Sequence, residues 1–250
     1  MTLHRLGDVA RDQGDTARGT ALLEESLALC RDLGFVVEAA LVLCGLGDVS
    51  CMQGEYPRAM ERYWEAVAMA QNAGDNSTLV WPLRNLGLLA RIQGDDGRVL
   101  ALLQEQVAWL REKAALTGLA VLLPILGTLV NRQGDARAAS VLLREGLLLQ
   151  QHQYWHQNMG LESFAEVAAG QDQPVRAVRC LGAAAAFHTA TRIQWPQAAR
   201  AASAHTLAAV RAQLDDATFA AAWAAGLALP LEQAIAEALG ASPIGNDASR

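Results

Sequence analysis

The sequence is poor in the residues that favour β-sheets. Aromatic residues make up only 5% of the 250 residues, and proline occurs seven times. Alanine and leucine supply much of the 52% of hydrophobic residues, while the β-branched residues that suit strands are sparse. Because alanine and leucine are strong helix formers, the composition predicts an all-α protein.

Positive charge is also scarce. The 20 lysine and arginine residues are outnumbered by 26 aspartate and glutamate residues, which gives a formal net charge of -6. A chain with this balance has no electrostatic footprint for nucleic acid or for an anionic membrane surface. We therefore expect no nucleic-acid partner for this chain.

Cysteine is limited to four residues whose spacing fits neither a zinc site nor a C-x-x-C redox motif. They are Cys30, Cys44, Cys51 and Cys180. In a chain of this length such cysteines are expected to be buried, reduced and small apolar residues.

No long apolar segment marks the chain for export or for a membrane. Arg5 and Asp8 lie where a secretory signal needs an unbroken apolar stretch. The uncharged segment 114–130 is near the lower length limit for a membrane-spanning helix, but it contains Pro124 and is in phase with a repeat. We therefore expect a cytoplasmic protein with no membrane segment.

What the sequence does contain is a repeat of 40 residues. One motif recurs as Gln13-Gly14-Asp15, Gln53-Gly54-Glu55, Gln93-Gly94-Asp95 and Gln133-Gly134-Asp135. A second recurs as Leu6-Gly7, Leu46-Gly47, Leu86-Gly87 and Leu126-Gly127, and a third as Glu25, Glu65, Glu105 and Glu145. A fifth copy over 164–173 is degraded. A period in this range indicates a solenoid of stacked units.

Each unit is predicted to hold two helices joined by the glycine-acid turn. In the third unit Leu83, Leu86 and Ala90 follow helical spacing and mark the buried stripe of a first helix. The turn glycine ends this helix, and the acid that follows begins a second helix. The Leu-Gly glycines are expected to face small residues such as Ala59 and Ala139, so that the paired helices approach closely.

These features resemble a known repeat family. Leu-Gly in the first helix, with Ala59 four residues before Tyr63 or Ala139 four before Leu143 in the second, resembles the tetratricopeptide repeat. The whole chain resembles the tetratricopeptide arrays of the MalT-like, LuxR-type and AfsR-type bacterial signal-transduction ATPase regulators. Segments 22–34 and 179–186 are typical of the sequences of these arrays. HEAT or armadillo repeats are the structural alternative at this period.

The resemblance implies a right-handed α-solenoid of about five tetratricopeptide-like helix pairs with a C-terminal helical cap. The cap is expected to contain three helices. The first ends near Leu214, the second begins after Asp215 and the third begins at Pro230. The first unit begins partway through its opening helix, so we expect an uncapped apolar face at Leu3, Leu6 and Val9, with self-association through it. The predicted array covers 1–190 in units of about 1–34, 35–74, 75–114, 115–154 and 155–190, followed by the cap at 191–240 and a disordered tail at 241–250.

Motifs for catalysis, metals and cofactors are missing. No G-x-x-x-x-G-K-[ST] phosphate loop or G-x-S-x-G turn occurs, and His152 and His156 lack the glutamate of H-E-x-x-H. We therefore expect no enzyme, no metal and no cofactor. The resemblance implies a protein-interaction or signal-sensing scaffold, the sensor part of a bacterial transcription regulator, and a small-molecule inducer receptor is the alternative.

In the family that the chain resembles, first helices line a concave groove, and the repeat register selects the residues that face it. We expect a partner protein or peptide there, with further modules of a larger regulator as other partners. The predicted groove residues are Asp48, Met52, Trp81, Arg84, Leu88, Arg91, Thr128, Asn131, Arg132, Glu162 and Glu166.

Overall fold

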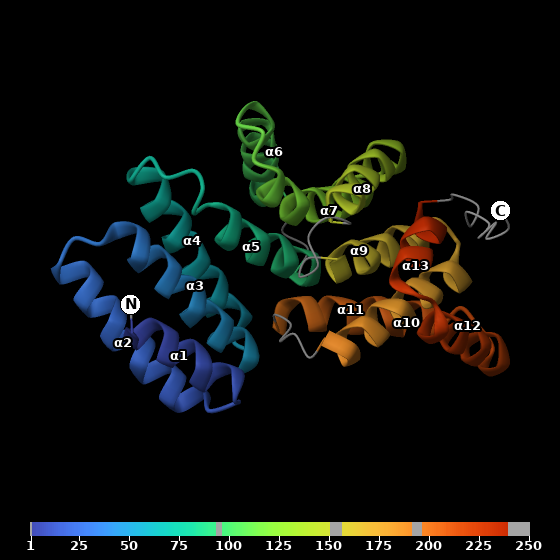
Figure 1. Ribbon diagram of the computed structural model, residues 1–250, viewed down its shortest axis with the longest axis horizontal. Helices are drawn as coiled ribbons and strands as arrows, with labels where there is room; N and C mark the ends of the chain where they lie inside the picture. The colour runs from blue at the N-terminus through green and yellow to red at the C-terminus, as the bar shows by residue number, and fades with distance from the viewer. Residues whose placement is uncertain (1, 94–96, 151–156, 192–196, 240–250) are drawn as a thin grey trace, which may run out of the picture. The chain divides into compact units, whose positions relative to one another are not determined.

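A computed structural model describes residues 2–93, 97–150, 157–191 and 197–239. These residues form helices and contain no strand, which confirms the all-α prediction (Figure 1). The helices are α1 (Thr2–Asp12), α2 (Thr16–Asp32), α3 (Val36–Met52), α4 (Tyr56–Asn72), α5 (Val80–Gln93), α6 (Gly97–Glu112), α7 (Leu116–Arg132), α8 (Ala136–Gln150), α9 (Gln157–Gly170), α10 (Pro174–Thr191), α11 (Gln197–Arg211), α12 (Asp216–Ala228) and α13 (Leu231–Ala238).

The chain divides into two compact units, which are described separately. Unit 1 comprises Met1–Gly118 and Gln194–Ala202, and unit 2 comprises Leu119–Ile193 and Ser203–Arg250. The division falls near the start of α7, close to the predicted start of the fourth unit at 115, and within α11, where the repeat pattern marks no boundary. The sequence-based boundaries of array, cap and tail stay a prediction, and the predicted tail lies outside the described residues.

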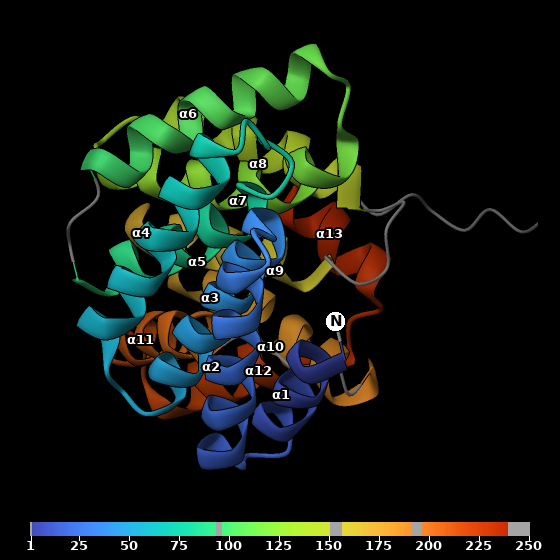
Figure 2. The same ribbon diagram turned by 90° about the vertical axis from the view of Figure 1, so that its left-hand side faces the viewer.

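Unit 1 is a stack of helix pairs. The helices α1, α3 and α5 (the first helices) pair with α2, α4 and α6 (the second helices), and α2 packs on α3 as α4 packs on α5 (Figure 2). Neighbouring first helices also contact each other, α1 with α3 and α3 with α5. This is the tetratricopeptide-like arrangement of paired helices that the repeat predicts.

The turns inside the pairs need a residue with positive φ. Gly14, Gly54 and Gly134 have φ of 84°, 77° and 93°, a region that residues with a Cβ rarely adopt. The Asp15 side chain then accepts a hydrogen bond from the backbone nitrogen of Arg18 at 3.1 Å and caps α2. The predicted turn at Gly94 and Asp95 lies outside the described residues.

The first helix of the third unit begins later than the period predicts. Val36 begins α3 and Leu116 begins α7, so the register places the start of α5 near residue 76, yet α5 begins at Val80. The Asp75 carboxylate accepts hydrogen bonds from Ser77 N at 3.0 Å and from Thr78 Oγ1 at 2.6 Å. These local bonds compete with helix formation and leave a longer loop before α5.

The regular spacing of the Leu-Gly glycines brings paired helices together, but their neighbours are mainly large residues. A Cβ on Gly47 would lie 2.4 Å from Tyr63 Cε1, and one on Gly127 would lie 3.0 Å from Leu143 Cγ. The predicted small residue Ala139 contributes its carbonyl oxygen, 3.3 Å from the same Cβ position. The glycines therefore make room for a bulky side chain of the second helix.

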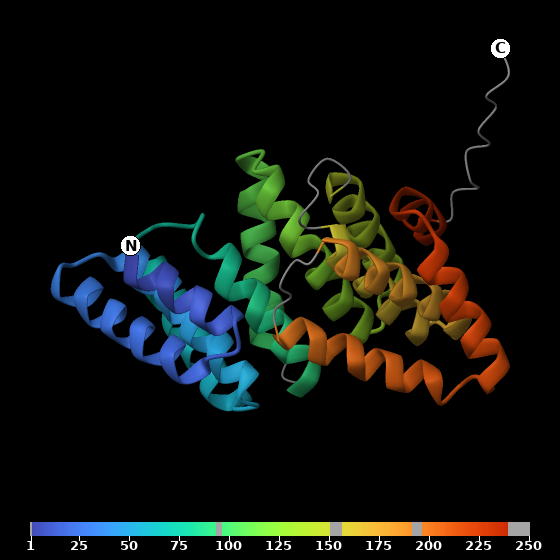
Figure 3. The same cartoon turned by 60° about the horizontal axis from the view of Figure 1, so that its bottom comes forward.

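Unit 2 contains the helix pair α9 and α10 and the helices that pack on it. α9 pairs with α10 and packs on α8, while α12 and α13 pack on α10 (Figure 3). The crossing of α10 and α12 is close, because Cβ atoms on Gly182 and Gly226 would lie 2.8 Å from Trp223 O and 2.4 Å from Arg179 O. The starts of α12 after Asp215 and of α13 after Pro230 agree with the sequence.

Arginines hold the end of α13 against the preceding helices. Arg144 on α8 donates a hydrogen bond to the backbone oxygen of Leu239 at 2.6 Å, and Arg176 on α10 donates to that of Ala238 at 2.8 Å. Arg179 forms an ion pair with Glu237 at 2.7 Å. Cationic groups at a helix C-terminus satisfy carbonyls that have no partner within the helix.

The structure also bears on the expectations for the cysteines, for the apolar face of α1 and for a membrane segment. All four cysteines are buried and free. Of the predicted apolar face of α1, Leu6 and Val9 are exposed to 46% and 52% and Leu3 is half-buried, and self-association through this face stays a prediction. None of the helices in the described ranges is both long and apolar enough to cross a membrane.

Candidate functional site

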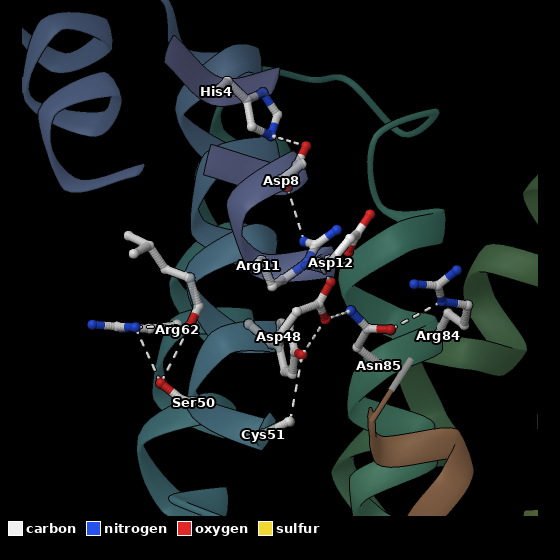
Figure 4. Close-up of polar contacts among 12 residues, drawn as sticks. His4, Asp8, Arg11, Asp12, Asp48, Ser50, Cys51, Arg62, Arg84 and Asn85 are labelled. Atoms are coloured by element: carbon white, nitrogen blue, oxygen red, sulfur yellow. Dashed lines mark hydrogen bonds and ion pairs between the residues drawn. The ribbon is translucent and has the colours of Figure 1, made fainter. Parts of the chain in front are cut away.

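The carboxylate of Asp48 on α3 joins four helices of unit 1. Its Oδ2 accepts a hydrogen bond from Nη1 of Arg11 on α1 at 3.3 Å (Figure 4). Its Oδ1 accepts from the Tyr63 hydroxyl of α4 at 2.6 Å and from Nδ2 of Asn85 on α5 at 3.0 Å. We call the set His4, Asp8, Arg11, Asp12, Asp48, Tyr63, Arg84 and Asn85 the Asp48 network.

On α1 the network continues through ion pairs at helical spacing. Arg11 Nη1 lies 2.9 Å from Asp8 Oδ1, and His4 Nε2 lies 3.4 Å from Asp8 Oδ2. Partial burial raises the pKa of Asp8 and lowers the pKa of His4. Burial disfavours the charge of Arg11, but Asp48, Asp8 and Asp12 outweigh it and raise the pKa of the guanidinium.

At the other end, Arg84 is held from two sides. Its Nε donates to Asn85 Oδ1 at 2.9 Å, and its guanidinium carbon lies 5.2 Å from the ring centroid of Trp81. Both contacts leave the terminal nitrogens unused, and no described residue forms an ion pair with Arg84. Arg84 is half-buried, and the two terminal NH2 groups of its guanidinium remain as donors.

Tyr63 couples the core to this network. Its side chain is fully buried, and its hydroxyl lies 3.6 Å from Cys51 Sγ as well as bonding to Asp48. Burial, together with the Asp48 charge, raises the pKa of Tyr63 well above 10. A buried tyrosine hydroxyl needs a hydrogen-bond partner, and Asp48 provides it.

The repeat register found part of the Asp48 network. It selected Asp48 and Arg84, which belong to the network and lie on neighbouring first helices. It also selected two residues outside the network, Trp81, which contacts Arg84, and Met52, which is half-buried four residues after Asp48. It did not select Asn85 or Tyr63. The sequence holds a signal for each of them. Asn85 is a polar residue directly before Leu86 of the buried stripe, and Tyr63 stands at the position where the other units have Leu23, Leu103 and Leu143.

Two predicted groove residues of α5 are not exposed. Leu88 is 2% exposed and Arg91 is 8% exposed. α5 contacts α3, α4 and α6, so more of its circumference is covered than a single buried stripe predicts. Neither side chain presents the open surface that the register led us to expect.

The remaining predicted residues belong to unit 2. Thr128 is fully buried and donates its hydroxyl hydrogen to Ile125 O of its own helix at 2.8 Å. Glu162 is also buried, 3.3 Å from Nε2 of His188, whose pKa is lowered to about 4 by burial. Asn131 and Glu166 are half-buried and Arg132 is exposed.

The described residues offer no metal site. They hold no group of three or more histidine, cysteine, aspartate and glutamate side chains that could bind a metal ion. His152 and His156 lie outside the described residues. Of the recurring glutamates, Glu65 forms an ion pair with Arg31 of the preceding second helix.

Comparison with known proteins supports the repeat. Residues 1–72, which span α1 to α4, match the tetratricopeptide repeat family. Repeats of this family generally mediate protein–protein interaction. A search of the curated proteins finds no match to the chain. The first two helix pairs are therefore similar to tetratricopeptide repeats in sequence as well as in their packing.

Proposed function

We propose that the chain is a non-catalytic interaction module that binds a partner protein segment across the first helices of unit 1. The segment carries an acidic residue next to apolar residues. The tetratricopeptide similarity supports a protein partner, because repeats of this family generally bind proteins. Solenoids use the extended surfaces formed by successive repeats for such binding.

The arrangement of Arg84 carries the proposal. Its Nε is bonded to Asn85 and its guanidinium carbon lies 5.2 Å from the ring centroid of Trp81, so the side chain is positioned before any partner arrives. A guanidinium with two free terminal nitrogens binds a carboxylate through two parallel hydrogen bonds. Pre-positioning lowers the entropy that binding would cost.

Neighbouring side chains supply the apolar part of the surface. Trp81 and Met52 are both half-buried, and each lies on a first helix beside the Asp48 network. Asp48 bonds Asn85, which in turn bonds Arg84, so the carboxylate of α3 helps to position the cation of α5. Asp48 is thereby a positioning residue rather than a contact for the acidic segment.

The other predicted residues take supporting places in this proposal. Asn131, Arg132 and Glu166 would form a separate contact surface of unit 2, while the buried Leu88, Arg91, Thr128 and Glu162 would maintain the helices. The resemblance to bacterial regulators extends the proposal to its biological setting. There the chain would be the cytoplasmic sensing part of a transcription or signalling regulator.

A peptide array tests the carboxylate preference with probes of defined sequence. Each apolar peptide carries one aspartate or glutamate, and its matched peptide carries asparagine or glutamine. We expect the chain to prefer the acidic member of the pairs. The Arg84→Gln variant should lower that preference about tenfold, because it removes a charge-assisted bidentate contact.

The matched control is Arg137→Gln, which removes an exposed arginine from α8 of unit 2. This variant should bind the array as the parent chain does. Equal binding of acidic and amide peptides by the parent chain, or an unchanged preference in Arg84→Gln, contradicts the proposal.

A further inference from the structure

A cleft of about 430 Å³ lies on the second helices of unit 1, between α4, α6 and the loop before α5. Its volume falls in the range of pockets that hold small ligands. The buried side chains of Val67, Leu79 and Leu83 contribute its apolar floor. This cleft is formed by side chains other than those of the Asp48 network.

The wall of the cleft is held in place by hydrogen bonds. Gln106 on α6 is buried, and its Nε2 donates to the backbone oxygen of Asn76 in the loop at 2.6 Å. The same loop is closed on itself by Asp75, which accepts hydrogen bonds from the backbone and hydroxyl of Thr78. The cleft is therefore a built feature of the loop and α6.

One face of α6 makes the cleft acidic. Glu105, Trp109 and Glu112 follow each other at spacings of four and three residues, and all three line the cleft. Glu105 and Glu112 are therefore two helical turns apart, about 10 Å along the axis, with the indole between them. No lysine, arginine or histidine lines the cleft.

The two carboxylates and the indole are not paired with a cation from the described part of the chain. Within the described ranges, no ion pair involves Glu105 or Glu112, and no guanidinium lies over the Trp109 ring. The neighbouring Trp64, in contrast to Trp109, has a guanidinium over its ring. Arg98 of α6 lies 3.8 Å from the ring centroid of Trp64 on α4, so this pair of helices already stacks one guanidinium on an indole.

We propose that the cleft binds an arginine side chain of a partner protein. The planar guanidinium stacks on Trp109 and donates hydrogen bonds to Glu105 or Glu112, while its methylene stem packs on the apolar floor. Arginine fits better than lysine, because its flat group can stack on the ring and bond a carboxylate at the same time. The cleft is thus a second interaction surface, of opposite charge preference to the one at Arg84.

The test uses the tripeptide acetyl-Leu-Arg-Leu-amide and its neutral citrulline analogue as probes. The tryptophan indole N–H signals of the ¹⁵N-labelled chain are recorded during titration, and the Trp109 signal is assigned from the Trp109→Phe variant. We expect a saturable shift of the Trp109 signal with the arginine peptide and none with the citrulline peptide. The citrulline side chain has the same shape without the positive charge, so this difference isolates the cation.

The double variant Glu105→Gln/Glu112→Gln should raise the Kd for the arginine peptide about tenfold or more, because it removes the charged acceptors. Glu61→Gln, which alters an exposed glutamate on α4 outside the cleft, should leave the Kd unchanged. The ¹⁵N spectrum of each variant reports whether it is folded. An absent Trp109 shift, an equal shift with citrulline, or an unchanged Kd in the folded double variant overturns the proposal. Arg84→Gln serves to separate the two surfaces, since it should not affect this titration.

Discussion

The ring of Tyr63 fills the space that a side chain at position 47 would need, since a Cβ on Gly47 would lie 2.4 Å from Cε1 of the tyrosine. The ring is fully buried and cannot move into solvent. This close approach of α3 and α4 also delivers the tyrosine hydroxyl to Asp48, one residue further along α3. Packing in the core and the polar contacts of the first helices therefore depend on the same glycine.

Gly47→Ala should destabilise the chain by about 1–3 kcal/mol, because the added methyl group forces the Tyr63 ring or the helix backbone to shift. Urea unfolding measures the free energy of unfolding. Gly97→Ala is the matched control, since a Cβ at position 97 of α6 meets nothing within 4 Å. That variant should be neutral or more stable by about 0.5–1 kcal/mol. Equal stability of the two variants would contradict the close contact.

Alkaline pH should destabilise the chain through Tyr63. Burial raises the pKa of this group in the folded chain, whereas in the unfolded chain it stays near 10. The contribution of the protonated hydroxyl is therefore complete below about pH 10 and is lost as the pH rises toward the folded pKa, with a slope of up to about 1.4 kcal/mol per pH unit.

Tyr63→Phe tests this pH dependence in urea unfolding series. The variant should lose part of the alkaline decline, and at neutral pH it should cost about 1–2 kcal/mol, since Asp48 loses a hydrogen bond. Tyr56→Phe, at the half-buried start of α4, should retain the decline. An identical alkaline slope in Tyr63→Phe and the parent chain would show that Tyr63 does not cause it.

The buried cysteines should react slowly with thiol reagents. Burial raises the pKa of Cys51 and of Cys180 to about 12 and that of Cys44 still further. At pH 8 a thiol with this pKa holds about a thousandfold less thiolate than an exposed one. Labelling with a chromogenic disulfide should therefore become fast only after urea unfolding. Ala28→Cys, at an exposed position of α2, should add one thiol that reacts quickly in the folded chain.

The end of α13 should loosen when its arginine is removed. Arg176 donates hydrogen bonds to the backbone oxygens of Glu237 and Ala238 at 3.2 Å and 2.8 Å. Arg176→Met should weaken the attachment of α13 by about 1–2 kcal/mol. Amide exchange across 231–238 should therefore become about tenfold faster. Arg137→Met, which removes an exposed arginine of α8, should leave that exchange unchanged. Protection of α13 that is unaltered in Arg176→Met would show that the arginine does not hold the helix.

The repeat predicted those parts of the fold that depend on residue type at a fixed position. A glycine is needed where φ is positive, as at Gly14 and Gly54, and a small residue is needed where helices cross closely, as at Gly47. Both requirements recur every 40 residues and leave the same letters in each unit. The start of α5 was missed because Asp75, Ser77 and Thr78 form hydrogen bonds that the period does not reveal.

The candidate site was harder to predict because it does not repeat. Asn85 and Tyr63 meet Asp48 through contacts between helices, and nothing in the repeat pattern requires these side chains. The burial of Leu88 and Arg91 likewise depends on how many neighbours surround α5 rather than on the pattern within it. Residue periodicity predicts the contacts that recur in every unit. It does not predict contacts that form at only one place in the stack.

Repeat arrays lengthen and shorten in evolution by gaining or losing whole units, and the Asp48 network limits that freedom. Its three donors come from three different repeats: Arg11, Tyr63 and Asn85. At the position of Tyr63 the first and third repeats hold Leu23 and Leu103, which cannot donate a hydrogen bond, whereas the positions of Arg11 and Asn85 are filled by Arg91 in the third repeat and by Arg5 in the first. Removing the first or the third repeat would take away one of these donors and leave the partly buried Asp48 carboxylate with fewer hydrogen bonds. The first three repeats therefore depend on one another through Asp48, although each has the same helix-pair fold.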